Sequence, residues 1–326
     1  MDTYARLFCY EITGKIREGA TAVVYSAKTA DGSPCVVKLF NASHAGNHEL
    51  DVHSSRFFLR ELEVLSESRH PNLIRLLDFG QTTDTGQDYL VLEWLPGEDF
   101  VSASKKASRH DFYSMLRQTC RALDYLHRRG FVHGDLKPDN LLTSFSETSS
   151  LEDPLVKLID FGYTTCSGTP FERVVECSPT YVAPEVIQGN PSTIASDLYS
   201  FGVILYECLA GVPPFPGREI GSVLRKHLQQ SPPSISTQVT RELHPMVQAL
   251  LSKDPTRRPA SAAETLRLIS NASGDVSLQP HTSTTWLATT SALQTVGRTH
   301  LHTSARSFLA GAFNDPPPAE PLVSCL

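Results

Sequence analysis

The sequence lacks an excess of basic residues and has no long hydrophobic run. With 29 lysines and arginines against 35 acidic residues, its formal net charge of −6 gives no broad positive field for nucleic acid or for an anionic membrane surface. No stretch approaches the roughly 20 apolar residues that cross a bilayer, and the first residues show no basic segment followed by an apolar one. We therefore expect a cytoplasmic protein with no membrane span and no nucleic-acid partner.

Paired cysteine motifs are also absent. The seven cysteines are an odd number, are scattered along the chain and include no CxxC pair. This pattern excludes a disulfide framework and a zinc site of the usual spacing, so we expect reduced and mostly buried thiols.

The first part of the chain is rich in β-strand signals. Between about residues 10 and 95, short runs such as VVYSAK and CVVKLF alternate with turn signals. One predicted helix interrupts them, with Ser54 or Ser55 as its expected N-cap. Its apolar face consists of Phe58, Leu62 and Leu65.

Beyond Pro96 the apolar spacing becomes helical. We predict helices over residues 110–129, 196–209, 220–228 and 239–251. After about Ser270 the chain is rich in Ser, Thr, His and Ala, so we expect a low-complexity, disordered tail over residues 271–326. The predicted fold class is α+β, with a small β-rich N-lobe over about 10–95 and a larger α-helical C-lobe over about 96–270.

A candidate nucleotide loop is IREGATAVVY, which runs from Ile16 to Tyr25 between two predicted strands. A hairpin that cradles phosphate needs flexible backbone, which glycine provides. Of the three glycines in a GxGxxG pattern only Gly19 is present, and Arg17 and Ala22 occupy the other two places. The loop alone therefore favours a phosphate site no more than a plain hairpin.

Two charged residues lie where apolar residues surround them. Lys38 is on the predicted strand CVVKLF, and Glu61 is in the predicted helix that follows. A lysine on a buried strand is costly unless it has a partner, and Glu61 is the obvious one. We predict that the two residues form an ion pair that can hold nucleotide phosphates.

The stretch VHGDLKPDNLL carries three polar residues suited to phosphoryl transfer. Asp135 is suited to orient a hydroxyl and take its proton, Lys137 to neutralise the moving phosphoryl group, and Asn140 to offer an oxygen to a metal ion. Shortly afterwards, Asp160 in LIDFG places a carboxylate between an apolar strand and a glycine, as a magnesium ligand requires.

In this order the motifs resemble those of the eukaryotic-like Ser/Thr protein kinases, over residues 10 to about 270. The matching stretches are VVK, RELEVL, HGDLKPDN, DFG, SPTYVAPE, SDLYSFG and DPTRRP. The resemblance implies a two-lobed protein kinase fold. It also implies that Asp197 braces the backbone of the catalytic loop and that Arg258 pairs with Glu185.

The resemblance further implies an enzyme that transfers the γ-phosphoryl group of ATP, with Mg²⁺, to serine or threonine hydroxyls of protein substrates. The implied catalytic residues are Asp135, Lys137, Lys38 and Glu61, and the implied metal ligands are Asn140 and Asp160. The implied nucleotide-binding residues are Ile16, Gly19, Ala22, Val24, Lys38, Glu93, Leu95 and Leu142. The oligomeric state is left open.

One departure from the family pattern lies in the catalytic loop, where Gly134 stands in place of an arginine that many relatives carry. That arginine usually pairs with a phosphate on the activation segment. Its absence predicts that phosphorylation controls the segment weakly. The candidate phosphoacceptors of the segment are Thr164, Thr165, Ser167 and Thr169, and Ser178 is expected near the catalytic aspartate.

Two other functions compete with this interpretation. HGD resembles small-molecule phosphotransferases such as aminoglycoside and choline kinases, but SPTYVAPE and DPTRRP favour a lobe that docks polypeptides. A binding module without turnover is favoured only by the nucleotide loop, in which two of the three expected glycines are replaced.

Overall fold

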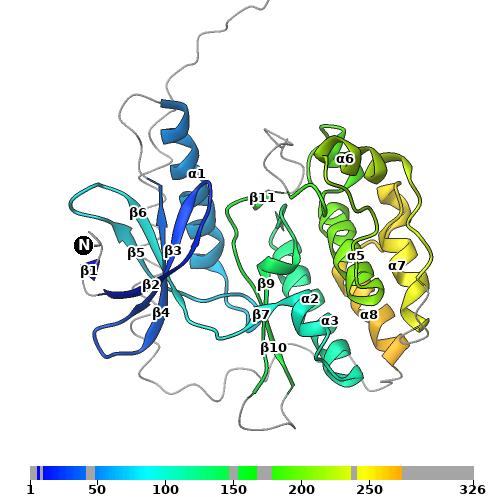
Figure 1. The fold of residues 1–326 in the computed structure, drawn as a ribbon, viewed down its shortest axis with the longest axis horizontal. Helices are drawn as coiled ribbons and strands as arrows, with labels where there is room; N and C mark the ends of the chain where they lie inside the picture. The colour runs from blue at the N-terminus through cyan, green and yellow to red at the C-terminus, as the bar shows by residue number, and fades with distance from the viewer. Residues whose placement is uncertain are drawn as a thin grey trace, which may run out of the picture.

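The structure is a computed structural model that describes residues 6–7, 10–41, 48–146, 153–166, 178–235 and 241–273. Two lobes are visible in Figure 1: a twisted sheet with one long helix, and a bundle of helices beside it. The predicted α+β class with two lobes is thus confirmed. Among the described helices, none combines the length and the apolar character that a membrane-spanning segment needs.

The N-lobe is an antiparallel sheet. In the part of the chain that the structure describes, its strands follow the order β1-β2-β3-β4-β6-β5. Their bounds are Arg6–Leu7 for β1, Tyr10–Glu18 for β2, Ala22–Lys28 for β3, Pro34–Phe40 for β4, Leu76–Gln81 for β5 and Asp88–Glu93 for β6. The β-branched and aromatic residues predicted to form strands do so because they pack well on a pleated, half-buried surface.

The helix α1, His48–Glu67, packs its apolar side chains against this sheet. Phe58 and Leu62 are fully buried, as the helical spacing predicted. The predicted N-cap at Ser54 or Ser55 is wrong, because the helix begins at His48. The first turns lack apolar periodicity, so the pattern gave no signal there, although residues such as Glu49 and Leu50 have good helix propensity.

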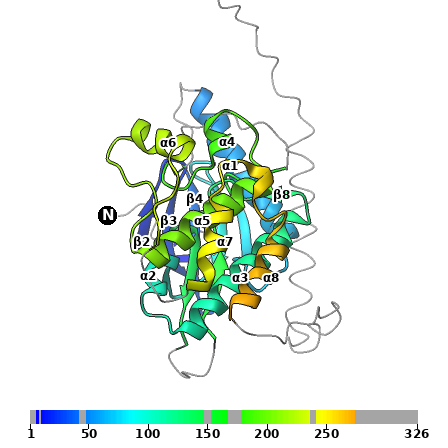
Figure 2. The same ribbon diagram turned by 90° about the vertical axis from the view of Figure 1, so that its right-hand side faces the viewer.

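The C-lobe is built around α5, Ile194–Ala210, whose first three turns are almost wholly buried. Figure 2 shows α5 in the middle of this lobe with other helices around it. These are α2 (Phe100–Ser104), α3 (Arg109–His127), α4 (Pro184–Ile187), α6 (Ile220–Gln229), α7 (His244–Leu250) and α8 (Ala262–Ser273). Gly211 ends α5 in the left-handed conformation, with φ of 78°, which a glycine adopts without strain.

Three predicted helices match α3, α5 and α6 to within two residues at each end. The fourth, predicted over 239–251, begins later. The 3₁₀ turn Arg241–Leu243 precedes α7, whose second residue is Pro245. Of the expected tail, residues 271–273 complete α8, and residues 274–326 lie outside the described part of the chain.

Short strands in two further small sheets flank several candidate site residues, among them Asn140, Leu142 and Asp160. The strands β10 (Leu155–Leu158), β9 (Leu141–Ser144) and β7 (Glu98–Asp99) form one small sheet, and β8 (Phe131–Val132) pairs with β11 (Thr165–Cys166). The backbone of Leu158 exchanges hydrogen bonds with Asn72 and Ile74 of the segment between α1 and β5. One hydrophobic cluster runs from Phe58 through Phe161 to the C-lobe, so β10 is held against both lobes.

Candidate active site

The charged centre of the site is Lys38 on β4. Its Nζ lies 2.5 Å from Oε2 of Glu61 on α1 and 2.8 Å from Oδ1 of Asp160, which follows β10. Lys38 and Glu61 are both buried. Burial alone would lower the pKa of Lys38, but the carboxylates of Asp160 and Glu61 outweigh it and raise that pKa above its ordinary value. The structure therefore brings together three residues that are far apart in the sequence.

Asp160 has an unusual backbone. Its φ of 64° lies in the left-handed region, where it is the single non-glycine residue among those described. Such a conformation costs free energy and persists only where the surroundings fix it. Phe161, fully buried in the core, and the ion pair with Lys38 supply that constraint. Although burial alone would raise the pKa of Asp160, Lys38 and then Arg17 hold it below its ordinary value, so the group is a carboxylate.

The catalytic-loop residues meet on the other side of the cleft. The Nζ of Lys137 donates to Oδ2 of Asp135 at 2.6 Å and to Oγ of Ser178 at 3.2 Å. The backbone N–H of Ser178 donates to Oδ1 of Asp135 at 3.2 Å. The Asp135 side chain is almost fully buried, and these contacts fix the direction of its two oxygens. Ser178 thus lies near Asp135, as the family pattern suggested.

Asn140 offers a vacant acceptor beside this loop. Its Nδ2 donates to the backbone oxygen of Asp135 at 2.8 Å, whereas its buried Oδ1 has no hydrogen-bond partner among the described residues. The backbone oxygen of Asn140 accepts from Ile159, the residue before Asp160. A buried amide oxygen without a partner is costly, and a hard cation would satisfy it. Asn140 and Asp160 both offer oxygen ligands, which magnesium prefers, and the Oδ1 of Asn140 lacks another partner among the described residues. The two residues therefore fit a magnesium site.

Asp197 on α5 holds the backbone of the catalytic loop in place. Its Oδ2 accepts the backbone N–H of His133 at 2.8 Å, and its Oδ1 accepts that of Gly134 at 3.0 Å. The ring of His127 lies 2.9 Å from Oδ2. Burial opposes ionisation, but His127 and these N–H groups hold the pKa of Asp197 below its ordinary value. The expected brace of the catalytic-loop backbone is confirmed.

Gly134 has a structural reason to be glycine. Its φ is 81°, and a Cβ at this position would lie 2.6 Å from the backbone oxygen of Tyr163. The sequence interpretation related the missing arginine to regulation alone. In this conformation, however, no side chain fits without a shift of the backbone near Tyr163.

This contact predicts a difference between two glycine substitutions. Gly130 has the same φ of 81°, but a Cβ there would meet no described atom within 4 Å. Gly130→Ala is expected to cost about 1–2 kcal/mol because of the left-handed backbone. Gly134→Ala should cost more, since the Tyr163 carbonyl must also move. Denaturant unfolding of both variants measures the difference, and equal losses would contradict a rigid contact.

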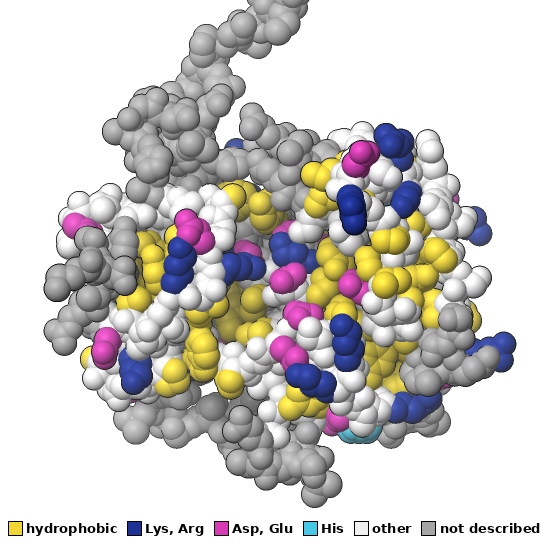
Figure 3. All heavy atoms as spheres, viewed as in Figure 1, with side chains coloured by type: hydrophobic (Ala, Val, Ile, Leu, Met, Phe, Trp, Pro, Cys, Tyr) yellow, Lys and Arg dark blue, Asp and Glu magenta, His cyan; other side chains and the backbone are white. Residues whose placement is uncertain are grey.

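A cleft lies between the lobes, and the expected nucleotide-binding residues come from several elements of the two lobes. Figure 3 shows a hollow there, with hydrophobic side chains on its floor and charged side chains at its rim. From the N-lobe come Ile16 at the end of β2, Gly19 in the turn, and Ala22 and Val24 on β3. Leu142 on β9 comes from the opposite side.

The segment after β6 connects the lobes through Glu93 and Leu95. Leu95 makes no hydrogen bond to any other described residue, which leaves its backbone N–H and C=O available to a ligand. The N–H of Glu93, in contrast, is already bonded to the backbone oxygen of Arg75. Leu95 is therefore better placed than Glu93 to offer a backbone donor to a base.

Two site-related residues escaped the sequence reasoning. Lys157 on β10 is buried, and its Nζ lies 2.6 Å from Oε1 of Glu93, so the carboxylate of Glu93 ties the connecting segment to β10. The run LVKLI carried the same signal as CVVKLF, a lysine among apolar residues. Arg17 was noted as a missing glycine, and no local pattern could show that its guanidinium lies 3.6 Å from Asp160.

The activation segment runs from DFG, with Asp160, to APE, with Glu185, and residues 160–166 and 178–185 of it belong to the described part of the chain. Thr164, one of the candidate phosphoacceptors expected to act weakly, is 1% exposed and is not accessible to a kinase in this conformation. It is buried because β11 pairs with β8 directly after it. Ser167 and Thr169 lie outside the described residues.

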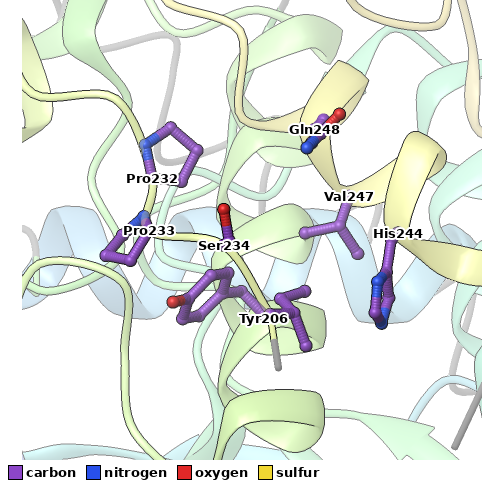
Figure 4. A pocket seen from close by; sticks show the side chains of 8 residues that line it. Tyr206, Pro232, Pro233, Ser234, His244, Val247 and Gln248 are labelled. Carbon is purple, nitrogen blue, oxygen red and sulfur yellow. The ribbon is translucent and has the colours of Figure 1, made fainter. Parts of the chain in front are cut away.

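A separate pocket of about 90 Å³ lies in the C-lobe (Figure 4). Tyr206 of α5, the segment Pro232–Ile235, and His244, Val247 and Gln248 of α7 line it. It shares no residue with the cleft, and it is smaller than the several hundred Å³ typical of ligand pockets.

This two-lobed fold, with Lys38, Glu61 and Asp160 joined as described above, is of the protein kinase type. A family model described as the protein kinase domain matches residues 10–268, and the chain belongs to the protein kinase family.

The chain is similar to several serine/threonine-protein kinases. It is 32% identical over 259 residues to human serine/threonine-protein kinase ULK3. The matched region covers 78% of this chain and 53% of that relative. It is 29% identical over 273 residues to a probable serine/threonine-protein kinase of Clostridium acetobutylicum, covering 80% and 39%. It is 30% identical over 275 residues to the probable kinase PknB of Bifidobacterium longum, covering 78% and 38%. The chain thus spans about half or less of the length of these relatives.

Proposed function

We propose that this chain is a protein serine/threonine kinase that transfers the γ-phosphoryl group of ATP to hydroxyl groups of protein substrates. The observation that carries the proposal is the pair of charge clusters facing one cleft. Lys38 joins Glu61 and Asp160, while Lys137 joins Asp135 and Ser178. The relatives, whose names are serine/threonine-protein kinases, support the class of acceptor.

The nucleotide would lie between the lobes. Lys38, fixed by Glu61, would bind its phosphates, and the free backbone groups of Leu95 would bind the base. Asn140 and Asp160 would hold magnesium, which neutralises charge on the phosphates when it is bound. Ile16, Ala22, Val24 and Leu142 would complete this site with apolar side chains.

At the reacting end, Asp135 would orient the acceptor hydroxyl and take its proton. The hydroxyl oxygen forms a bond to the γ-phosphorus while the bond to the departing ADP oxygen breaks. Lys137 lies within 2.6 Å of Asp135 and would neutralise charge on the transferring group. A cytoplasmic location and the lack of a nucleic-acid partner stay predictions of the sequence.

Labelled ATP tests this function directly. We expect label to pass to a generic protein such as casein, and phosphoamino-acid analysis to find phosphoserine or phosphothreonine. Transfer to an aminoglycoside or to choline without transfer to protein would favour a small-molecule phosphotransferase. Absence of both nucleotide binding in calorimetry and turnover at millimolar ATP would favour a binding module.

The variant Asp160→Asn tests the proposed function by mutation. It keeps the size of the side chain but removes the charge that faces Lys38, so we expect phosphotransfer to fall by roughly 100-fold or more. Circular dichroism and gel filtration should show an unchanged fold. A folded variant with wild-type turnover would contradict the role of Asp160.

A further inference from the structure

Strand register places Arg17 on the same face of the N-lobe sheet as Lys38. It lies opposite Val24 on β3, and Val24 lies opposite Lys38 on β4. Residues directly opposite in an antiparallel sheet project from the same face. Arg17 therefore shares the face of Lys38, and a bulge between Lys15 and Arg17 adjusts its direction.

Both cations of this face approach one carboxylate. The Nη2 of Arg17 lies 3.6 Å from Oδ2 of Asp160, and the Nζ of Lys38 lies 2.8 Å from Oδ1. The Arg17 side chain is 49% exposed, so this contact contributes little to the stability of the fold. Its guanidinium makes no hydrogen bond to a described residue, which leaves its N–H donors unused.

The charges around Asp160 indicate which kind of ligand the N–H donors of Arg17 would bind. A metal ion held by Asp160 would compete with Arg17 for this carboxylate, because both are cations. A guanidinium released from Asp160 needs another anion, and phosphate oxygens match its planar donors. The loop from Glu18 to Ala22 contains one glycine, so it has less flexible backbone with which to enclose phosphate.

We infer that Arg17 is a phosphate-binding residue of the nucleotide site, whose charged side chain supplies a contact that a glycine-rich loop supplies through its backbone. Its ligand is the phosphate chain of ATP or ADP. It does not contact the adenosine part. This inference rests on the proposed function, since it requires that the cleft binds ATP.

Arg17→Gln removes the charge and keeps most of the side chain. We expect calorimetry to show roughly tenfold weaker binding of MgATP and of MgADP, the loss of one charge-assisted contact. Binding of adenosine should stay within about twofold of wild type, because adenosine has no phosphate. Arg17→Lys should restore part of the affinity for ATP, since it keeps the charge but not the planar donors.

Lys15→Gln is the matched control. Lys15 lies on the same strand with a 50% exposed side chain, and it pairs with Glu18 rather than with Asp160. This variant should bind both nucleotides as wild type does. An equal loss in Lys15→Gln would indicate a general effect of charge and would overturn the inference.

Other outcomes distinguish a failure of this inference from a failure of the proposed kinase function. If wild type binds MgATP and Arg17→Gln binds it equally well or more tightly, the inference fails and the kinase proposal stands. If Arg17→Gln loses adenosine as strongly as ATP, Arg17 shapes the site instead of binding phosphate, and the inference fails. If wild type binds no nucleotide, both the inference and the proposed function fail.

Discussion

Asp135→Asn is expected to lower kcat by roughly 100-fold to 10,000-fold, the range for loss of a general base. Asparagine keeps an oxygen that can accept from Lys137 or Ser178, so the loop should retain its shape. It cannot take the proton of an acceptor hydroxyl. The affinity for MgATP should change little, because Lys38 and Asp160 lie on the nucleotide side of the site.

Asp139→Asn provides the control in the same loop. Asp139 is exposed, and the same change removes one negative charge four residues away. Steady-state phosphorylation of a peptide, with calorimetry for MgATP, compares the two variants. Comparable losses in kcat would assign the effect to the charge of the loop and would contradict the role of Asp135 as a base.

Arg258→Ala is expected to destabilise the fold by about 3–5 kcal/mol, the cost of leaving a buried charge without its partner. Arg258 is 5% exposed, and its two terminal nitrogens donate to Oε1 and Oε2 of Glu185 at 2.7 and 2.8 Å. It also donates to the backbone oxygens of Ser252 and Ala195. The substitution therefore leaves a carboxylate and two carbonyl groups without this donor.

Arg257→Ala is the control for this loss, because Arg257 is the exposed neighbour. Denaturant unfolding should show a change below about 0.5 kcal/mol for that variant, as for most surface substitutions. A loss below about 1 kcal/mol in Arg258→Ala would show that the Glu185 pair does not hold the end of the activation segment in place.

The same pair predicts how stability depends on pH. Burial alone would raise the pKa of Glu185, but the hydrogen bonds from Arg258 hold it below its ordinary value of 4.5. A carboxyl with a lowered pKa in the folded state stabilises the fold above that ordinary value, and this contribution is lost as the pH falls through the folded-state pKa. Wild type should therefore lose more stability than Arg258→Ala between pH 6 and pH 3 in denaturant unfolding.

The sequence by itself determined the family, the lobes and most of the elements. Strand runs such as CVVKLF and the helical face of Phe58 and Leu62 are local patterns of apolar residues. The structure buries these apolar side chains, so the patterns predicted the elements correctly. The apolar residues around Lys38 and Glu61 indicated that these two residues pair, because a lysine on a buried strand needs a partner. For that reason the candidate site residues could be named before their positions were known.

Only the tertiary structure decided contacts that depend on distant backbone. The distance of 3.6 Å between Nη2 of Arg17 and Oδ2 of Asp160 depends on the register of β2, β3 and β4. The sequence of one strand does not show how that strand pairs with its neighbours. The close approach of Gly134 to Tyr163 likewise joins segments that meet only when β8 pairs with β11. A sequence pattern reports which face of an element is apolar, whereas these contacts depend on where two elements meet, and that is fixed by packing of the whole core.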